Sequence, residues 1–399
     1  MKKVSCHSAF GFGLALTLAA CGGSTPPAES SAPLAVPPPV TQPAPVVSAP
    51  PPPPELTAEQ KKQHEEEQRL TADRASMEAD AEKELARWTP ELRQQAKALA
   101  ERKYPNLKVA LDAVLTSPIR APGHPERDLY RHPRETLTFF GLRPNMTVLE
   151  YGPGEGWYTE ILAPTLAASG KLLVTNTDPA GPKTSRSTFY AERVQRTLAK
   201  SPELFGKVDV AIVDPKQPTL GLENKVDVAL VIRGMHGWVQ NGQVEAWLST
   251  LHTALKPGGT LGIVQHRSIP GADPATSAKT GYLPEAWVVS TIEAAGFKLS
   301  AKSEINANPK DTKDYEAGVW ALPPTFRLKD KDRLKYASIG ESDRMTLRFV
   351  KVPRKTPATA ATSVAPKSAV STPAAASSTS PASPTGTTPA TPAVPKATN

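Results

Sequence analysis

The chain has 399 residues, of which 39% are hydrophobic and 43 are prolines, and its formal net charge is +8. This length allows one or two domains, but proline-rich stretches near both ends exclude much of it from a hydrophobic core. The positive excess is mild between residues 56 and 353 and forms no basic stripe. Composition therefore does not indicate a nucleic-acid-binding protein.

The N-terminus has the pattern of an export signal over residues 1–20. Two lysines precede an apolar run from Ala9 to Leu18, which is too short to span a membrane. The following Leu-Ala-Ala-Cys21 resembles the bacterial lipobox, which implies lipid modification of Cys21. An ordinary cleaved signal peptide is the alternative. Under either interpretation, the mature protein contains no intramolecular disulfide, because the other cysteine, Cys6, lies inside the signal.

The residue after Cys21 predicts the location of the mature protein in the cell. This residue is Gly22 and not aspartate, which by resemblance to Gram-negative sorting rules implies the outer membrane. We therefore expect a lipid-anchored protein of the bacterial cell envelope that faces the periplasm. Its expected partners are the membrane, through Cys21, and a small-molecule or envelope substrate.

Two segments have compositions that cannot form a core. Residues 21–55 are rich in proline and predict an extended linker, at about 3.1 Å per residue. Residues 354–399 contain mainly Ala, Ser, Thr and Pro with four basic residues and no acid, which predicts a disordered tail. Between them, residues 56–105 form a charged region that predicts a solvated helix up to Arg87 and a second helix from Pro90 to about Lys103.

A glycine-rich loop is the central motif of the remaining region, residues 106–353. Residues 147–151 are mostly apolar or β-branched and predict a short buried strand, and an amphipathic helix is expected over residues 157–166. Between them the sequence reads Glu150-x-Gly152-x-Gly154-x-Gly156. Glycine accepts positive φ and leaves room for a ligand against the backbone, so this order predicts a nucleotide cradle. A plain glycine turn is the alternative.

Strands and helices continue to alternate along the chain. The predicted strands after the first cover residues 170–175, 208–213, 227–232, 260–264, a sixth that follows Phe297, and 347–352. The other predicted helices cover residues 135–140, 187–200, 243–255 and 285–295. This alternation predicts an α/β fold with a doubly wound, mainly parallel sheet.

The glycine loop, the Lys256-Pro257-Gly258-Gly259 turn and the closing strands resemble those of class I S-adenosylmethionine-dependent methyltransferases. The resemblance covers roughly residues 127–352 and implies a seven-stranded Rossmann-like sheet with S-adenosylmethionine as cofactor. Short motifs such as Gly340-Glu341-Ser342-Asp343-Arg344 are similar, more narrowly, to a small family of bacterial methyltransferases that are often exported.

The resemblance also implies cofactor-binding residues. Glu150 and the three loop glycines would hold the amino-acid half of the cofactor. The ribose is expected at the end of the second strand, where Asn176 replaces the usual acid and Asp178 follows two residues later. Asp214, after the third strand, would accept the adenine amino group.

Other polar and aromatic residues are expected on the methyl-acceptor side. His236 and His266 follow the fourth and fifth strands and are the candidates for a general base. Cofactor or substrate contacts are expected from Tyr130, Arg131, His132, Tyr158 and Trp238, and an acidic substrate from Arg267 or Arg344. No cysteine and histidine cluster indicates a metal site.

Two alternatives remain open at this point. The periplasm is not expected to supply S-adenosylmethionine, so a non-catalytic envelope-binding or scaffolding lipoprotein with a degenerate methyltransferase fold is the main one. A nicotinamide-binding enzyme is the other, although the loop spacing differs from Gly-x-Gly-x-x-Gly. Residues 307–345 exceed the length of a hairpin and are expected to form a lid.

The lipobox interpretation predicts that replacement of Cys21 with serine releases the protein from membranes, because serine offers no thiol for lipid attachment. Membrane fractionation of wild type and Cys21→Ser, with Cys6→Ser as the matched control, measures this. Retention of Cys21→Ser in the membrane fraction would contradict lipid anchoring.

Overall fold

The computed structural model describes residues 56–353. The expected signal peptide, Cys21, the linker and the tail lie outside the described residues. From Ala58 onward the described residues belong to one compact unit. None of the helices in this region is both long and apolar enough to cross a membrane.

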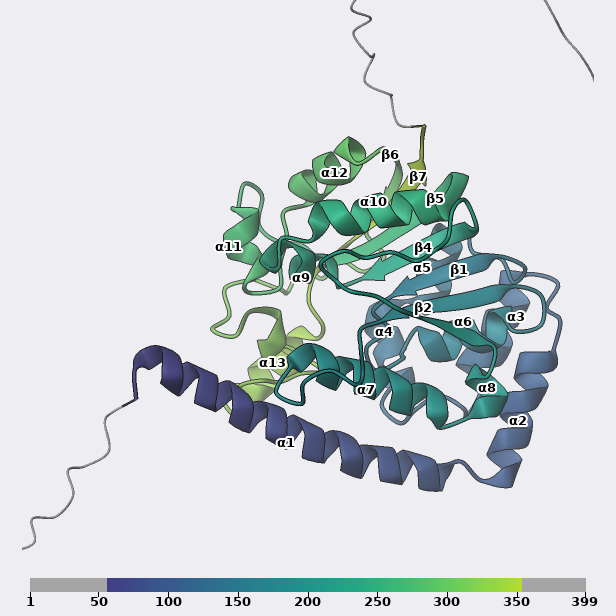
Figure 1. Cartoon of the computed structure of the whole chain (residues 1–399), viewed down its shortest axis with the longest axis horizontal. Coiled ribbons are helices and arrows are strands. Elements are labelled where there is room, and N and C mark those ends of the chain that lie inside the picture. Colours follow the sequence, from purple (N-terminus) through teal and green to yellow (C-terminus); the bar gives the residue numbers. More distant parts are fainter. Residues whose placement is uncertain (1–55, 354–399) are drawn as a thin grey trace, which may run out of the picture. The chain divides into compact units, whose positions relative to one another are not determined.

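The described region contains a seven-stranded sheet with the order β3-β2-β1-β4-β5-β7-β6 (Figure 1). Its strands are β1 Thr147–Tyr151, β2 Lys171–Asn176, β3 Val208–Ile212, β4 Val226–Ile232, β5 Leu255–His266, β6 Phe297–Ser303 and β7 Arg344–Lys351. Neighbouring strands from β3 to β5 pair in parallel, whereas β7 is antiparallel to both of its neighbours. This arrangement confirms the predicted α/β fold class.

The central strand β1 is hydrophobic on both faces because helices cover both sides of the sheet. Val148 and Leu149 are fully buried and point to opposite faces, where they join two separate apolar clusters. Val148 pairs with Leu172 of β2 on one side and Val228 of β4 on the other. The carboxyl end of β1 is therefore fixed between two neighbouring strands.

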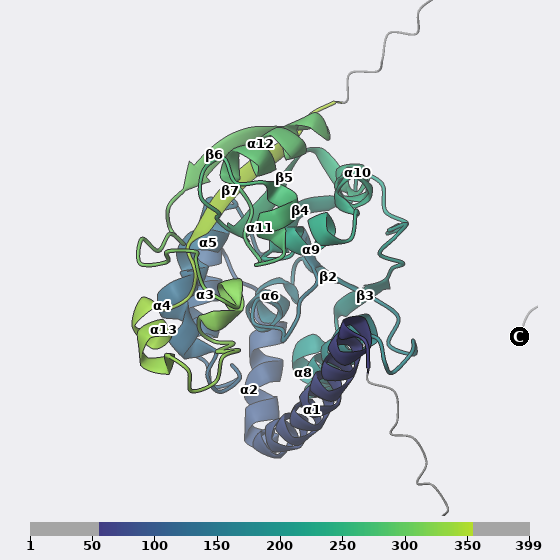
Figure 2. The same cartoon turned by 90° about the vertical axis from the view of Figure 1, so that its left-hand side faces the viewer.

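Figure 2 shows the helices on either side of the sheet. The cluster around Val148 receives side chains from α2 Pro90–Glu101, α3 Leu107–Leu115, α5 Pro133–Phe139, α6 Thr159–Leu166 and α8 Pro202–Phe205. The cluster around Leu149 receives side chains from α9 Met235–Gln240, α10 Val244–Ala254, α11 Pro274–Ala278 and α12 Glu285–Ala294. These two layers complete a doubly wound architecture.

The first two helices differ in their relation to the core. α1 (Ala58–Arg87) has Leu70 as its single buried residue, in agreement with the expected solvated helix. It contacts α7 (Arg186–Ala199), where Arg186 pairs with Glu66. In contrast, α2 packs on α6 and α8, and its N-cap Thr89 accepts a hydrogen bond from the Leu92 amide.

Two strands are longer than predicted. β5 begins at Leu255, so the Lys256-Pro257-Gly258-Gly259 turn belongs to the strand that it was expected to precede. β7 begins at Arg344 because this residue pairs with His266 at the end of β5. Buried hydrophobic residues alternate along β7 from Met345 onward, so the predicted start at residue 347 was three residues late.

The segment between β6 and β7 contains the short helix η2 (Gly318–Ala321) and α13 (Arg333–Ile339). It has a small apolar cluster of its own that includes Tyr315, Leu322 and Tyr336. Two further short helices, η1 (Pro125–Arg127) and α4 (Asp128–Arg131), precede α5. These additions to the sheet supply several polar side chains of the site, among them Arg127, Arg131 and Glu341.

Candidate functional site

The loop after β1 leaves open space beside its backbone. Gly152, Gly154 and Gly156 have φ values of 53°, 63° and 77°, a region that side chains disfavour. A Cβ atom at Gly152 would meet nothing within 4 Å, and one at Gly154 would meet only Arg193 Nη2, at 3.9 Å. At Gly156 it would lie 2.5 Å from the Thr197 side chain. The first two glycines therefore border free space, and the third allows close packing against α7.

A cavity of about 310 Å³ lies against this loop, at the carboxyl ends of β1, β4 and β5. Its walls come from the glycine loop, from Ile232 and Arg233 after β4, and from His266 of β5. Trp320 and neighbouring residues of the β6–β7 segment form a further wall. The segment expected to be a lid therefore borders the cavity, which lies at the sheet edge where ligands of open α/β folds bind.

Glu150, near the end of β1, is 3% exposed and lines the cavity. The Thr159 hydroxyl donates a hydrogen bond of 2.8 Å to its carboxylate. Burial raises the pKa of Glu150 to about 7, and the bond from Thr159 offsets only part of this increase. The structure thus holds an acid with a shifted pKa beside the open glycines.

His236 and His266 both line the cavity, with their ring centroids 5.9 Å apart. Burial lowers the pKa of His236 to about 4 and lowers that of His266 well below its ordinary value. Both imidazoles are therefore neutral at pH 7, the state that a general base requires. His266 Nδ1 lies 2.5 Å from the Ser342 hydroxyl, which is also buried.

Glu341, which is 4% exposed, joins three arginines from different parts of the chain. Arg127 Nε lies 2.9 Å from its carboxylate, Arg131 Nε 3.1 Å and Arg344 Nη1 2.8 Å. The outer nitrogens of Arg131, which is 2% exposed, have no hydrogen-bond partner, and its guanidinium lies 4.8 Å above the Trp157 ring. The carboxylate thus connects the β6–β7 segment to the helices before β1.

Arg233 is one of the cavity residues that the sequence analysis did not propose for the site, together with Trp320, Glu341 and Ser342. It follows β4, lines the cavity and has a left-handed φ of 58°. Within the described region its guanidinium forms no hydrogen bond or ion pair, and its Nε is buried. Burial lowers its pKa to about 10. The sequence feature that could have identified it is an arginine directly after a hydrophobic strand.

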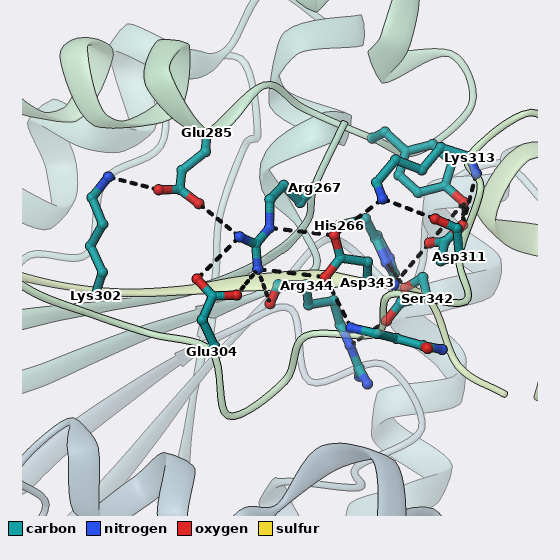
Figure 3. A network of polar contacts seen from close by, with 12 residues as sticks. His266, Arg267, Glu285, Lys302, Glu304, Asp311, Lys313, Ser342, Asp343 and Arg344 are labelled. Atoms are coloured by element: carbon teal, nitrogen blue, oxygen red, sulfur yellow. Dashed lines mark hydrogen bonds and ion pairs between the residues drawn. The ribbon is translucent and has the colours of Figure 1, made fainter. Parts of the chain in front are cut away.

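Arg267 and Arg344, the expected contacts for an acidic substrate, are engaged elsewhere. Figure 3 shows Arg267 among three carboxylates, and its nitrogens lie 3.3 Å from Glu285, 2.5 Å from Glu304 and 3.4 Å from Asp343. Arg344 donates to Glu341 and to the Tyr130 carbonyl. Neither arginine lines the cavity. Their partners indicate that they stabilise the fold.

The same network includes polar residues between 308 and 313. The Asp311 carboxylate accepts hydrogen bonds from the Tyr282 hydroxyl and from the Asp343 amide, and Lys313 Nζ lies 3.2 Å from the Asp343 carboxylate (Figure 3). The Asn308 side chain donates to the carbonyls of Ile339 and Glu341. These bonds fix both ends of the β6–β7 segment against the sheet.

The residues expected at the adenosine end do not reach the cavity. The Asn176 side chain donates to the Ala191 carbonyl and accepts from the Thr177 amide, so both of its polar ends are occupied. Asp178 and Asp214 are exposed, and each accepts a hydrogen bond from a nearby backbone amide. None of these three expected cofactor contacts therefore lines the cavity.

The remaining expected contacts divide between the cavity and the protein interior. Tyr158 lines the cavity, and burial raises its pKa to about 12. Trp238 is fully buried and stacks on Trp247, so it belongs to the core and forms no cavity wall. Neither Tyr130 nor His132 lines the cavity, because Tyr130 packs beside Gly340 and His132 links α4 to α5 with φ of 40°.

These residues fit one half of S-adenosylmethionine. Open space at Gly152 and Gly154 leaves room for the amino-acid half, and the buried Glu150 carboxyl lies beside it. The residues expected at the ribose and adenine do not line the cavity: the Asn176 amide is hydrogen-bonded within the protein, and Asp178 and Asp214 lie outside the cavity. Within residues 56–353, no cluster of three or more His, Cys, Asp or Glu is arranged to hold a metal ion.

The shifted pKa of Glu150 predicts a pH-dependent stability. Between pH 4.5 and about 7 the folded chain keeps a proton that the unfolded chain has lost, so the free energy of unfolding falls as pH rises. Glutamine does not ionise, so Glu150→Gln avoids this fall. Its free energy of unfolding, relative to that of wild type, should therefore be higher at pH 8 than at pH 5 by up to about 3 kcal/mol. Urea unfolding at both pH values measures this difference. Glu155→Gln, a substitution of an exposed glutamate, is the control. An equal effect of Glu150→Gln at both pH values would contradict the prediction.

Comparison with known proteins gives one family match. Residues 126–285 match the family model described as "Methyltransferase domain". Among curated protein sequences, none matches the chain.

Solved structures similar to this chain include three methyltransferases. One is a SAM-dependent methyltransferase from Aquifex aeolicus, at 19% identity over 59% of this chain and 95% of that chain, with a TM-score of 0.37. The N-methyltransferase NodS from Bradyrhizobium japonicum is 17% identical, and the match covers 57% of this chain and 97% of NodS, with a TM-score of 0.36. A methyltransferase from Mesorhizobium loti is 14% identical, and the match covers 57% of this chain and 100% of that chain, with a TM-score of 0.36. The strand order shows a Rossmann-like methyltransferase fold, and residues 126–285 of it match the model of a methyltransferase domain.

Proposed function

We propose that this protein is an S-adenosylmethionine-dependent methyltransferase that acts on a small acceptor in the cavity beside the glycine loop. The observation that carries the proposal is the open space at Gly152 and Gly154, which adjoins the Glu150 carboxyl and two neutral histidines in one cavity. Cofactor cradle and candidate base are thus adjacent, as transfer between two bound molecules requires.

The residues of the loop have distinct roles in this proposal. Backbone groups of Gly152 and Gly154 contact the amino-acid half of the cofactor, because no side chain fills that space. The Glu150 carboxylate attracts its amino group, an interaction that strengthens as the acid ionises near pH 7. When bound, S-adenosylmethionine supplies a methyl group that is already activated by the sulfonium.

Chemistry on the acceptor requires mainly alignment and proton removal. His266 is assigned as the base, with Nδ1–H donating to the Ser342 hydroxyl so that Nε2 is free to accept a proton. The buried Ser342 fixes the orientation of the ring. Trp320 of the β6–β7 segment covers the cavity, which limits access of water to the reacting groups.

A second candidate is a non-catalytic binding protein with a degenerate methyltransferase fold. The observation that favours it is the position of Asn176, Asp178 and Asp214, none of which lines the cavity. In that case the cavity binds a ligand other than S-adenosylmethionine. We also propose export and lipid anchoring through Cys21, a proposal supported by the sequence of the N-terminus.

The enzymatic proposal predicts that the purified protein binds S-adenosylhomocysteine with micromolar affinity in titration calorimetry. Gly154→Val should abolish this binding, because the added side chain extends into the open space beside the loop. Gly258→Val is a matched control: Gly258 also has positive φ, a Cβ atom there would meet nothing within 4 Å, and it does not line this cavity.

The control separates blocked binding from backbone strain, which both substitutions introduce. Loss of binding in Gly154→Val alone supports the cradle. Equal affinity of a folded Gly154→Val variant and wild type would refute it. No binding to wild type at millimolar ligand would reject the methyltransferase proposal in favour of the binding protein.

A further inference from the structure

The cavity holds more positive than negative charge. Four arginines line it, namely Arg127, Arg131, Arg193 and Arg233, and the Glu341 carboxylate pairs with the first two of them. The other two glutamates at the cavity offset only part of this excess. Glu150 has a pKa of about 7, and the exposed Glu155 pairs with Arg193 at 3.0 Å and with Arg127 at 3.8 Å. A bound anion would balance the remaining charge.

Arg233 differs from the other three arginines because nothing in the described region pairs with it. Arg127 and Arg131 contact Glu341 and Arg193 contacts Glu155, whereas the Arg233 guanidinium has no ion pair and no hydrogen bond. A buried charge without a partner reduces stability. Its left-handed backbone adds strain, and such strain persists where surrounding structure enforces it, often at functional sites.

The position of Arg233 places it on the acceptor side of the cavity. It follows β4, two residues beyond Val231, which pairs with Tyr151 at the end of β1. Its positive charge acts on both His236 and His266. An anion held by Arg233 would therefore lie beside the imidazoles, and the open space at Gly152 and Gly154 would remain for the cofactor.

We propose that Arg233 binds an oxyanion of the methyl acceptor, so that the acceptor is a small molecule carrying a carboxylate or phosphate group. The assignment of this anion to an acceptor rests on the proposed function, whereas the anion site itself does not. A guanidinium presents a planar set of donors that matches either oxyanion. Binding there holds the rest of the acceptor against His266.

The test measures thermal unfolding of the full-length protein with added inorganic phosphate or acetate, against chloride at equal ionic strength. An occupied site raises the Tm by roughly 2–4 °C at about ten times the dissociation constant. The stronger of the two responses identifies the preferred oxyanion. No specific response of wild type to either anion would overturn the proposal.

Substitutions of Arg233 separate binding from structure. Arg233→Met should raise the Tm without anion, because it removes a partly buried guanidinium that has no ion pair, and should abolish the anion response. Arg233→Lys should retain part of the response. Arg143→Met is the matched control, because it removes an exposed arginine before β1, outside this cavity, and should respond as wild type does. A lower Tm for Arg233→Met with an intact anion response would overturn the proposal.

Binding of S-adenosylhomocysteine distinguishes this inference from the proposed function. We expect its dissociation constant to change less than about twofold in Arg233→Met. A tenfold loss would assign Arg233 to the cofactor and overturn its role in acceptor binding. If S-adenosylhomocysteine bound neither wild type nor any variant, methyl transfer would be rejected. The Tm shift with phosphate or acetate, and its loss in Arg233→Met, would then test the anion site independently of methyl transfer.

Discussion

The site depends on one buried carboxylate. Glu341 precedes β7, yet it contacts Arg127 and Arg131, which lie before β1. These contacts fix the β6–β7 segment over the carboxyl edge of the sheet, where its residues complete the cavity wall. Loss of this carboxylate would leave three arginines without their shared partner, which is why its contribution exceeds that of an exposed ion pair.

The same arrangement separates structural charges from charges that remain free to bind ligands. Arg267 is surrounded by three carboxylates and Arg344 by Glu341 and backbone carbonyls, so their charges are balanced within the protein. Arg233 remains unpaired beside two neutral histidines. The cavity therefore combines a cation, candidate bases and an open glycine loop, three features that a fold alone does not require.

Sequence patterns predicted the fold well because its signals are local. The β1 strand, its glycine loop and the following helix all occur where periodicity and composition placed them. The site was predicted in part: Glu150, Tyr158 and both histidines line the cavity, but Arg267 and Trp238 do not. Those two were misassigned because their partners, Glu304 and Trp247, are distant contacts that no local pattern reveals. Arg233 was missed for the same reason, since its significance is the absence of a partner.

A crystal structure of the protein with S-adenosylhomocysteine tests the central claim most directly. The account predicts that the amino-acid half of the ligand lies against Gly152 and Gly154 near Glu150, with Arg233 free of contact to it. Ligand bound elsewhere on the protein, or a side chain filling the space beside these glycines, would contradict the account.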